Sequence, residues 1–147
     1  MTTAVNILNR EEDQRVVEAI RQAERNTSGE IKVHIENHCR GNVEKRSLLV
    51  FNKLKLNETQ LRNGVLVYLA VKDRKFAILG DEGINKVVEA DFWNDVKDLM
   101  LNHFKEGRFA EGLVQGIMRC GEKLKTCFPY QTDDINEIPD EISYGNN

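Results

Sequence analysis

Residues 61–83, LRNGVLVYLAVKDRKFAILGDEG, decide the fold expected for this chain, because they describe two strands joined by a tight turn. Residues 64–71 are continuously apolar, which is typical of a strand buried on both faces. Residues 72–75 are all charged, so they are too polar to bury and suit a hairpin turn. Residues 76–79 then return antiparallel to the first strand. The hairpin therefore brings both ends of this stretch to the same edge of the sheet.

The chain before the hairpin predicts a helix, a strand and a second helix. Asn9 is placed to cap the first helix with Glu12 as the other half of a capping box. Residues 30–36 alternate between apolar and polar side chains, which predicts a half-buried strand and suits an edge position. Residues 43–56 follow as a helix. The order strand, helix, strand is a βαβ unit, so residues 30–36 and 64–71 should lie parallel.

Three helices are expected after the hairpin, over residues 84–88, from Asp91 to Gly107, and over 109–127. Gly112 and Gly116 weaken the last helix, which suggests that it packs closely against a neighbouring element. The predicted fold class is α/β: a three-layer α/β/α sandwich, in which a small mixed sheet combines the βαβ unit with an antiparallel hairpin.

Length and composition indicate one globular domain. The chain has 147 residues, 40% of them hydrophobic, and a net charge of −3. No basic stripe with interleaved aromatic residues is present, which argues against nucleic-acid binding. The N-terminus does not resemble a signal peptide, and no apolar run is long enough for a membrane span. Free cysteines at 39, 120 and 127, without a CxxC pair, fit a reducing cytosol, so a cytoplasmic location is expected.

The C-terminal segment differs from the rest of the chain. Residues 130–147 contain five acidic residues and no Lys or Arg, and few apolar residues. We therefore expect a folded domain over residues 1–129 and a flexible acidic tail over 130–147. The tail could dock on a basic protein partner.

The hairpin edge is the candidate functional site, because the predicted topology gathers acidic and amide side chains there. Carboxylate and amide oxygens suit Ca²⁺ or Mg²⁺ better than zinc. The candidate ligands are Glu30, Asn63, Asp81, Glu82 and Asp91.

A simpler interpretation of the same residues stays open. Asp81 and Asp91 each precede a helix, and an aspartate that caps a helix needs no metal. This edge is also the amino end of the parallel strands, whereas ligands of open α/β sheets usually bind at the carboxyl ends. His34, at the other end of its strand, is expected to be an exposed strand residue beside a loop.

Several stretches in combination carry a resemblance to a known family: residues 28–31, 62–66, 80–84, 91–93, 103–107 and 112–117. They resemble the TPM domain of the thylakoid-lumen acid-phosphatase-like proteins, which include a photosystem II repair factor and many bacterial proteins. The resemblance covers roughly residues 9–128. It implies a Rossmann-like α/β/α sandwich with an acidic cleft for divalent cations, in which Asp81 and Asp91 match the family's acids and Glu30 and Asn63 transfer less directly.

The sequence and the resemblance together suggest three hypotheses for the function. The first is a divalent-cation-binding domain that is non-catalytic or regulatory. The second, implied by the family's name, is a metal-dependent phosphatase acting on phosphomonoesters, with Arg62 steadying the phosphoryl oxygens. The third is an interaction adaptor that uses the acidic tail.

Overall fold

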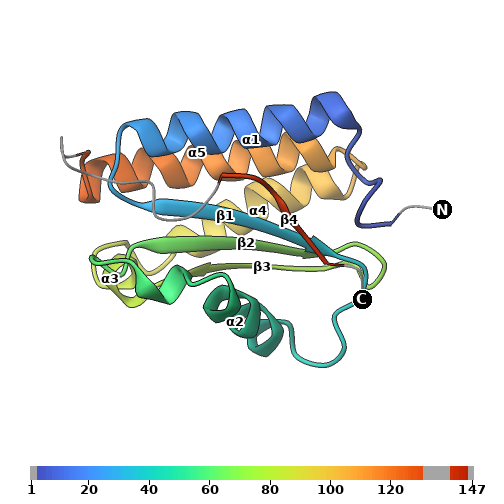
Figure 1. The fold of residues 1–147 in the computed structure, drawn as a ribbon, viewed down its shortest axis with the longest axis horizontal. Helices are drawn as coiled ribbons and strands as arrows, with labels where there is room; N and C mark the ends of the chain where they lie inside the picture. The colour runs from blue at the N-terminus through green and yellow to red at the C-terminus, as the bar shows by residue number, and fades with distance from the viewer. Residues whose placement is uncertain (1–2, 131–139, 146–147) are drawn as a thin grey trace.

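The computed structural model describes residues 3–130 and 140–145 and has three layers, with a sheet between two layers of helices (Figure 1). The strands are β1 (Glu30–Glu36), β2 (Gly64–Ala70), β3 (Lys75–Gly80) and β4 (Ser143–Tyr144). The helices are α1 (Arg10–Arg25), α2 (Val43–Lys53), the 3₁₀ turn η1 (Leu56–Glu58), α3 (Glu82–Asn85), α4 (Phe92–Phe104) and α5 (Phe109–Cys127).

The sheet is mixed and has the strand order β3-β2-β1-β4. β1 lies parallel to β2, and β2 lies antiparallel to β3, so the predicted βαβ unit and hairpin are both confirmed. The predicted α/β/α fold class is confirmed as well. β4, which pairs with β1 in parallel through His34 and Ile35, is an addition that the sequence analysis did not predict.

The two faces of the sheet are covered unequally. Helices α1, α4 and α5 lie on one face and α2 lies on the other (Figure 1). The larger apolar core lies under the three helices, and a smaller one lies under α2. The predicted close packing of α5 is present, because a Cβ on Gly116 would collide with the side chain of Met100 in α4. The capping box of Asn9 and Glu12 is also present at the start of α1.

The expectation of a half-buried β1 is wrong, because all seven of its residues are buried. The residues after position 139 account for two of the polar members of this strand. Lys32 donates from Nζ to the carbonyl oxygen of Glu141 at 2.5 Å, and His34 Nδ1 lies 2.8 Å from the hydroxyl of Ser143. A strand that reads as amphipathic is therefore enclosed by a segment from the far end of the chain.

The predicted acidic tail is described only in part. Ile142 is buried and Ser143–Tyr144 form β4, so this part of the tail packs on the domain. Residues 131–139, with three of the tail's acids, lie outside the described residues. Within the described part of the chain, no helix has the length and apolar character needed to cross a membrane.

Candidate functional site

Strand register aligns the ends of three strands at the candidate site. Glu30 pairs with Gly64 across β1 and β2, and Val65 pairs with Gly80 across β2 and β3. The segments that flank these positions are joined by backbone hydrogen bonds, including one from Asp81 N to the carbonyl oxygen of Gly64 at 3.0 Å. The hairpin thus places residues 62–64 and 80–82 together, as the sequence predicted.

The centre of this edge is an ion pair between Arg62 and Asp81. Arg62 donates from Nε and Nη2 to the two carboxylate oxygens of Asp81, at 2.7 and 2.9 Å. Its Nη1 lies 3.4 Å from Oε1 of Glu82. The Asp81 side chain is only 7% exposed, whereas that of Arg62 is 43% exposed. Two parallel charge-assisted bonds fix both groups, and Asp81 is held on its guanidinium partner.

Asp81 also caps the short helix α3. One of its carboxylate oxygens accepts a hydrogen bond from Glu82 N at 2.8 Å. The helix-cap interpretation of Asp81 is therefore confirmed, while metal binding at this residue stays a prediction.

The backbone around Arg62 is tightly constrained. Arg62 has a φ of 50°, in the left-handed region that is uncommon for a residue with a side chain. A Cβ at Gly83 would collide with the carbonyl oxygens of Leu61 and Arg62, so only glycine fits there. Gly83 N donates to the Arg62 carbonyl oxygen at 2.9 Å. Two carbonyl oxygens therefore lie immediately beside Gly83, the residue that follows Glu82.

Asn63 is a structural member of the edge. Its side chain is 1% exposed and donates from Nδ2 to the hydroxyl of Ser28 at 3.3 Å. Its backbone N–H donates to Oγ1 of Thr59 at 3.1 Å. Asn63 thereby ties the start of β2 to the segment before β1.

Glu30 is buried at the start of β1, close enough to the carboxyl group of Glu24 in α1 to interact with it electrostatically. The pKa of Glu24 is raised well above its usual range by burial, by a hydrogen bond with Asp140 and by the charge of Glu30. Glu24 also accepts a hydrogen bond from Ile31 N at 2.7 Å. Glu30 therefore interacts with the carboxyl group of Glu24 at the start of β1.

Asp91 is the predicted ligand that the structure separates from the others. It is exposed at the start of α4, and it makes no side-chain capping hydrogen bond. Within residues 3–130 and 140–145, no group of three or more His, Cys, Asp or Glu side chains is arranged to hold a metal ion. The structure brings Asp81 and Glu82 together on Arg62 and does not add Asp91 to them.

A second polar cluster, which the sequence analysis missed, lies at the carboxyl end of β1. Glu36 is fully buried and accepts two hydrogen bonds from Arg46 of α2, both at 2.7 Å. It also accepts a bond from the hydroxyl of Tyr68 in β2 and lies 2.9 Å from Nε2 of His34. His34 is itself buried, so its expected exposure is wrong. We call Glu36, Arg46, Tyr68 and His34 the Glu36 cluster.

Charge balance explains why Glu36 stays ionised. Burial alone would raise its pKa, but the hydrogen bonds from Arg46, Tyr68 and His34 together lower the pKa to about 2. Burial lowers the pKa of His34. The sequence signal for this cluster was Tyr68, which places a hydroxyl inside an otherwise apolar strand. A buried tyrosine hydroxyl needs a hydrogen-bond partner, and here that partner is Glu36.

The chain is similar to a known family and to solved structures. The family model described as the TPM domain matches residues 1–123. The NMR structure of the BA42 protein from the psychrophilic bacterium Bizionia argentinensis is 47% identical, with a TM-score of 0.90, and the match covers 99% of this chain and 100% of that one.

Two more distant structures share the fold. The N-terminal domain of a protein from P. gingivalis is 20% identical with a TM-score of 0.69, over 84% of this chain and 80% of that one. The N-terminal domain of the cg2496 protein from Corynebacterium glutamicum is 12% identical with a TM-score of 0.64, over 80% of this chain and 74% of that one. No curated protein matches the chain.

Proposed function

Because this chain belongs to the TPM domain family, we propose that it is a divalent-cation-binding domain whose acidic pair, Asp81 and Glu82, exchanges Arg62 for Ca²⁺ or Mg²⁺. The site is non-catalytic, and cation binding stabilises the hairpin edge. The observation that carries the proposal is the bidentate Arg62–Asp81 pair. A guanidinium occupies the position where an acidic pair would hold a metal cation.

The donor set is chemically suited to a hard cation. Asp81 and Glu82 supply carboxylate oxygens, and the carbonyl oxygens of Leu61 and Arg62 lie beside Gly83. Ca²⁺ takes about six to eight oxygen ligands and Mg²⁺ about six, so most ligands here would be backbone oxygens and water. With two carboxylates at most, the site fits a weak, water-rich cation site and does not fit a tight protein cage.

Arg62 is able to leave Asp81 at modest cost. Its side chain is 43% exposed, so the guanidinium regains water when it moves away. Asp81 is 7% exposed and cannot regain water in the same way. A buried carboxylate that loses one cation favours the binding of another.

Phosphatase activity has less support from the same residues. Arg62, the cation that would steady a phosphoryl group, is engaged by Asp81 and Glu82. The histidines lie elsewhere, beside Glu36, Asp73 and Arg108. The adaptor function would use the acidic tail, residues 130–147, and replacing its acids at positions 133, 134 and 137 with amides tests it by the loss of binding to a basic partner.

The test follows the thermal midpoint while CaCl₂ or MgCl₂ is titrated into protein first stripped with EDTA. Binding to the folded state alone raises stability by about 2.7 kcal/mol at a hundredfold excess over Kd. The wild-type midpoint should rise, and that of Asp81→Asn should not. Arg62→Ala should be less stable than wild type in EDTA and should recover most of the loss in calcium, because the metal replaces the missing guanidinium.

The matched control is Glu106→Gln, which removes an exposed acid that is also paired with an arginine, Arg108, away from this edge. Its response to calcium should equal that of wild type. A wild-type protein indifferent to millimolar calcium and magnesium contradicts the proposal. So does an undiminished response in Asp81→Asn.

A further inference from the structure

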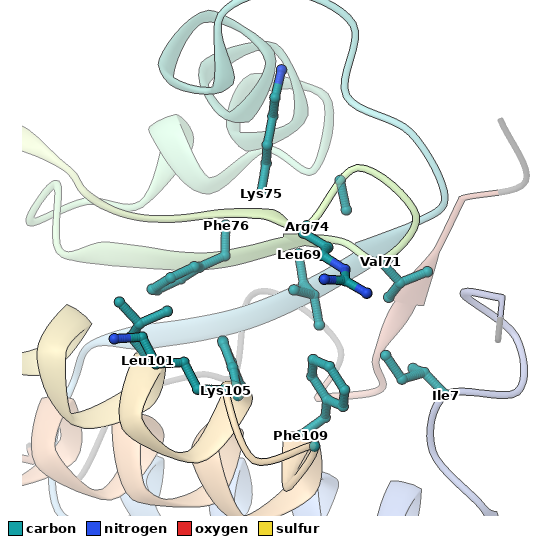
Figure 2. A pocket seen from close by; sticks show the side chains of 12 residues that line it. Ile7, Leu69, Val71, Arg74, Lys75, Phe76, Leu101, Lys105 and Phe109 are labelled. Carbon is teal, nitrogen blue, oxygen red and sulfur yellow. The ribbon is translucent and has the colours of Figure 1, made fainter.

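A cavity lies at the opposite end of the sheet from Arg62 and Asp81. It has a volume of about 520 Å³ and opens between the turn at residues 71–74 and the junction of α4 and α5 (Figure 2). Ligand pockets in proteins have volumes of about 300–1,000 Å³. The lining includes Leu69 and Ala70, the last residues of β2, so the cavity lies at the carboxyl ends of the parallel strands. This is the end at which open α/β sheets usually bind ligands.

The inner wall of the cavity is aromatic. Phe76 of β3 meets Phe104 of α4 edge to face, with ring centroids 5.1 Å apart and planes at 84°. Phe104 stacks on Phe109 of α5 at 5.4 Å and 28°. All three rings are only partly buried, so their remaining surface faces the cavity and the solvent in it. This wall suits the apolar body of a ligand.

Two cations lie at the opening. Arg74 in the turn and Lys105 at the end of α4 both line the cavity and are exposed. Figure 2 shows the guanidinium of Arg74 on the cavity side of the turn, whereas Lys75 points away. Lys75 is engaged elsewhere, since its Nζ donates to the carbonyl oxygens of Cys39 and Gly41 at 3.1 and 2.9 Å.

The described part of the cavity contains no acid to neutralise these cations. No acidic residue is among its described lining residues. Asp73, the acid beside Arg74, is turned away from the cavity. Its carboxylate accepts a hydrogen bond from the backbone N–H of Cys39 at 2.7 Å and lies 3.1 Å from Nδ1 of the His38 side chain. The opening therefore combines an apolar wall with an unbalanced positive rim.

The backbone at Arg74 adds an independent observation. Arg74 has a φ of 53°, a conformation that glycine or asparagine would adopt more easily than a residue with a long side chain. This conformation keeps an arginine at the rim of the cavity, where its charge faces an apolar wall.

We propose that this cavity binds a small organic acid, with the carboxylate held by Arg74 and the apolar body packed against Phe76, Phe104 and Phe109. Lys105, whose ammonium lies beside Leu101 and away from Arg74 in Figure 2, adds positive charge to the rim without a direct bond to the acid. The aromatic wall disfavours inorganic anions, which would leave it in contact with water. The positive rim disfavours apolar cations and selects ligands with a negative charge. The proposal is independent of cation binding at Arg62 and Asp81.

Decanoate, below its micelle-forming concentration, is the probe, and the readout is a titration of backbone amide NMR signals. The signals of residues 74–76 and 104–109 should shift saturably in wild-type protein. Arg74→Gln should weaken binding about tenfold, the effect of losing one charge-assisted hydrogen bond, and Lys105→Gln should weaken it less, because only rim charge is lost. Both residues are exposed, so the spectra of the free variants should report an intact fold.

Two controls make the test specific. Lys72→Gln removes an exposed cation from the same turn that does not line the cavity, and it should bind decanoate as wild type does. Decyltrimethylammonium, with a chain of the same length and the opposite charge, should produce no saturable shift of these signals. The proposal is overturned if decanoate gives no saturable shift, if both amphiphiles bind equally, or if Arg74→Gln binds decanoate as Lys72→Gln does.

Discussion

Glu36 has no exposed surface although it ends a strand, and its charge is balanced entirely within the protein. Arg46 supplies the opposite charge through two bonds, and Tyr68 and His34 occupy the remaining directions around the carboxylate. A buried carboxylate with this many partners is stabilising only while it is ionised. Glu36 should therefore control the response of the fold to acid.

The first prediction concerns this acid response. The folded pKa of Glu36, about 2, lies below its ordinary value of 4.5. Its contribution to stability is therefore fully present above pH 4.5 and is lost as the pH falls toward 2. At neutral pH this contribution is on the order of 3 kcal/mol. In urea unfolding, Glu36→Gln should be less stable than wild type by about that amount at pH 7, and the difference should shrink steadily below pH 4.5.

The control for the acid response is Glu106→Gln, whose carboxylate is exposed in its pair with Arg108. It should leave the pH dependence of unfolding almost unchanged. A loss of stability in Glu36→Gln that is the same at pH 2.5 and pH 7 would contradict the assignment of the acid response to Glu36.

Among the described strands, β4 is the shortest, and it covers the outer edge of β1, where Lys32 and His34 lie. It adds one residue pair at His34 and one at Ile35, and Gly145 N donates to the Ile35 carbonyl oxygen at 2.8 Å. Ile142, just before it, is 8% exposed and joins the larger core. Without β4, the outer edge of β1 would present unpaired backbone groups to solvent.

The second prediction is that β4 contributes directly to stability. Removing residues 142–147 should lower the free energy of unfolding by about 2 kcal/mol or more, because it deletes a buried Ile and the edge pairing. Hydrogen exchange of the β1 amides should quicken most. Removing only residues 146 and 147 is the matched control and should change neither quantity. Equal stability of the two truncated proteins would mean that β4 has no stabilising role.

Local sequence patterns were sufficient to predict elements formed by neighbouring residues. They were insufficient to predict contacts between residues that are far apart in the sequence. The apolar run at 64–71 and the charged turn after it predicted the hairpin and the edge at Asp81 correctly. β4 was missed because its residues lie in an acidic segment and are held through backbone pairing. The Arg62–Asp81 pair was missed because its members are 19 positions apart and their side-chain geometry depends on a turn with positive φ at Arg62.

The whole molecule has two cores of different size on the two faces of one sheet. The core under α2 is the smaller and consists of few buried residues: Cys39, Val50, Phe51, Leu56, Leu66, Tyr68 and Ala70. The core under α1, α4 and α5 spans most of the other elements. The Glu36 cluster links α2 to the sheet through Arg46. Since apolar burial dominates stability, the α2 layer should open before the rest of the protein.

The third prediction tests this order of opening by native-state hydrogen exchange. Amides of α2 should exchange with a lower opening free energy than amides in the middle of α5. Ile117→Val, in the larger core, should lower the opening free energy of α5 by about 1 kcal/mol and leave that of α2 unchanged, because α5 stays folded when α2 opens alone. Arg46→Met should lower the opening free energies of α2 and α5 equally. The reason is that α2 is unfolded both in the partly unfolded state, in which α2 opens alone, and in the fully unfolded state, in which α5 opens. If α2 and α5 share one opening free energy in the wild type, and both variants shift them together, the two layers unfold as a single cooperative unit.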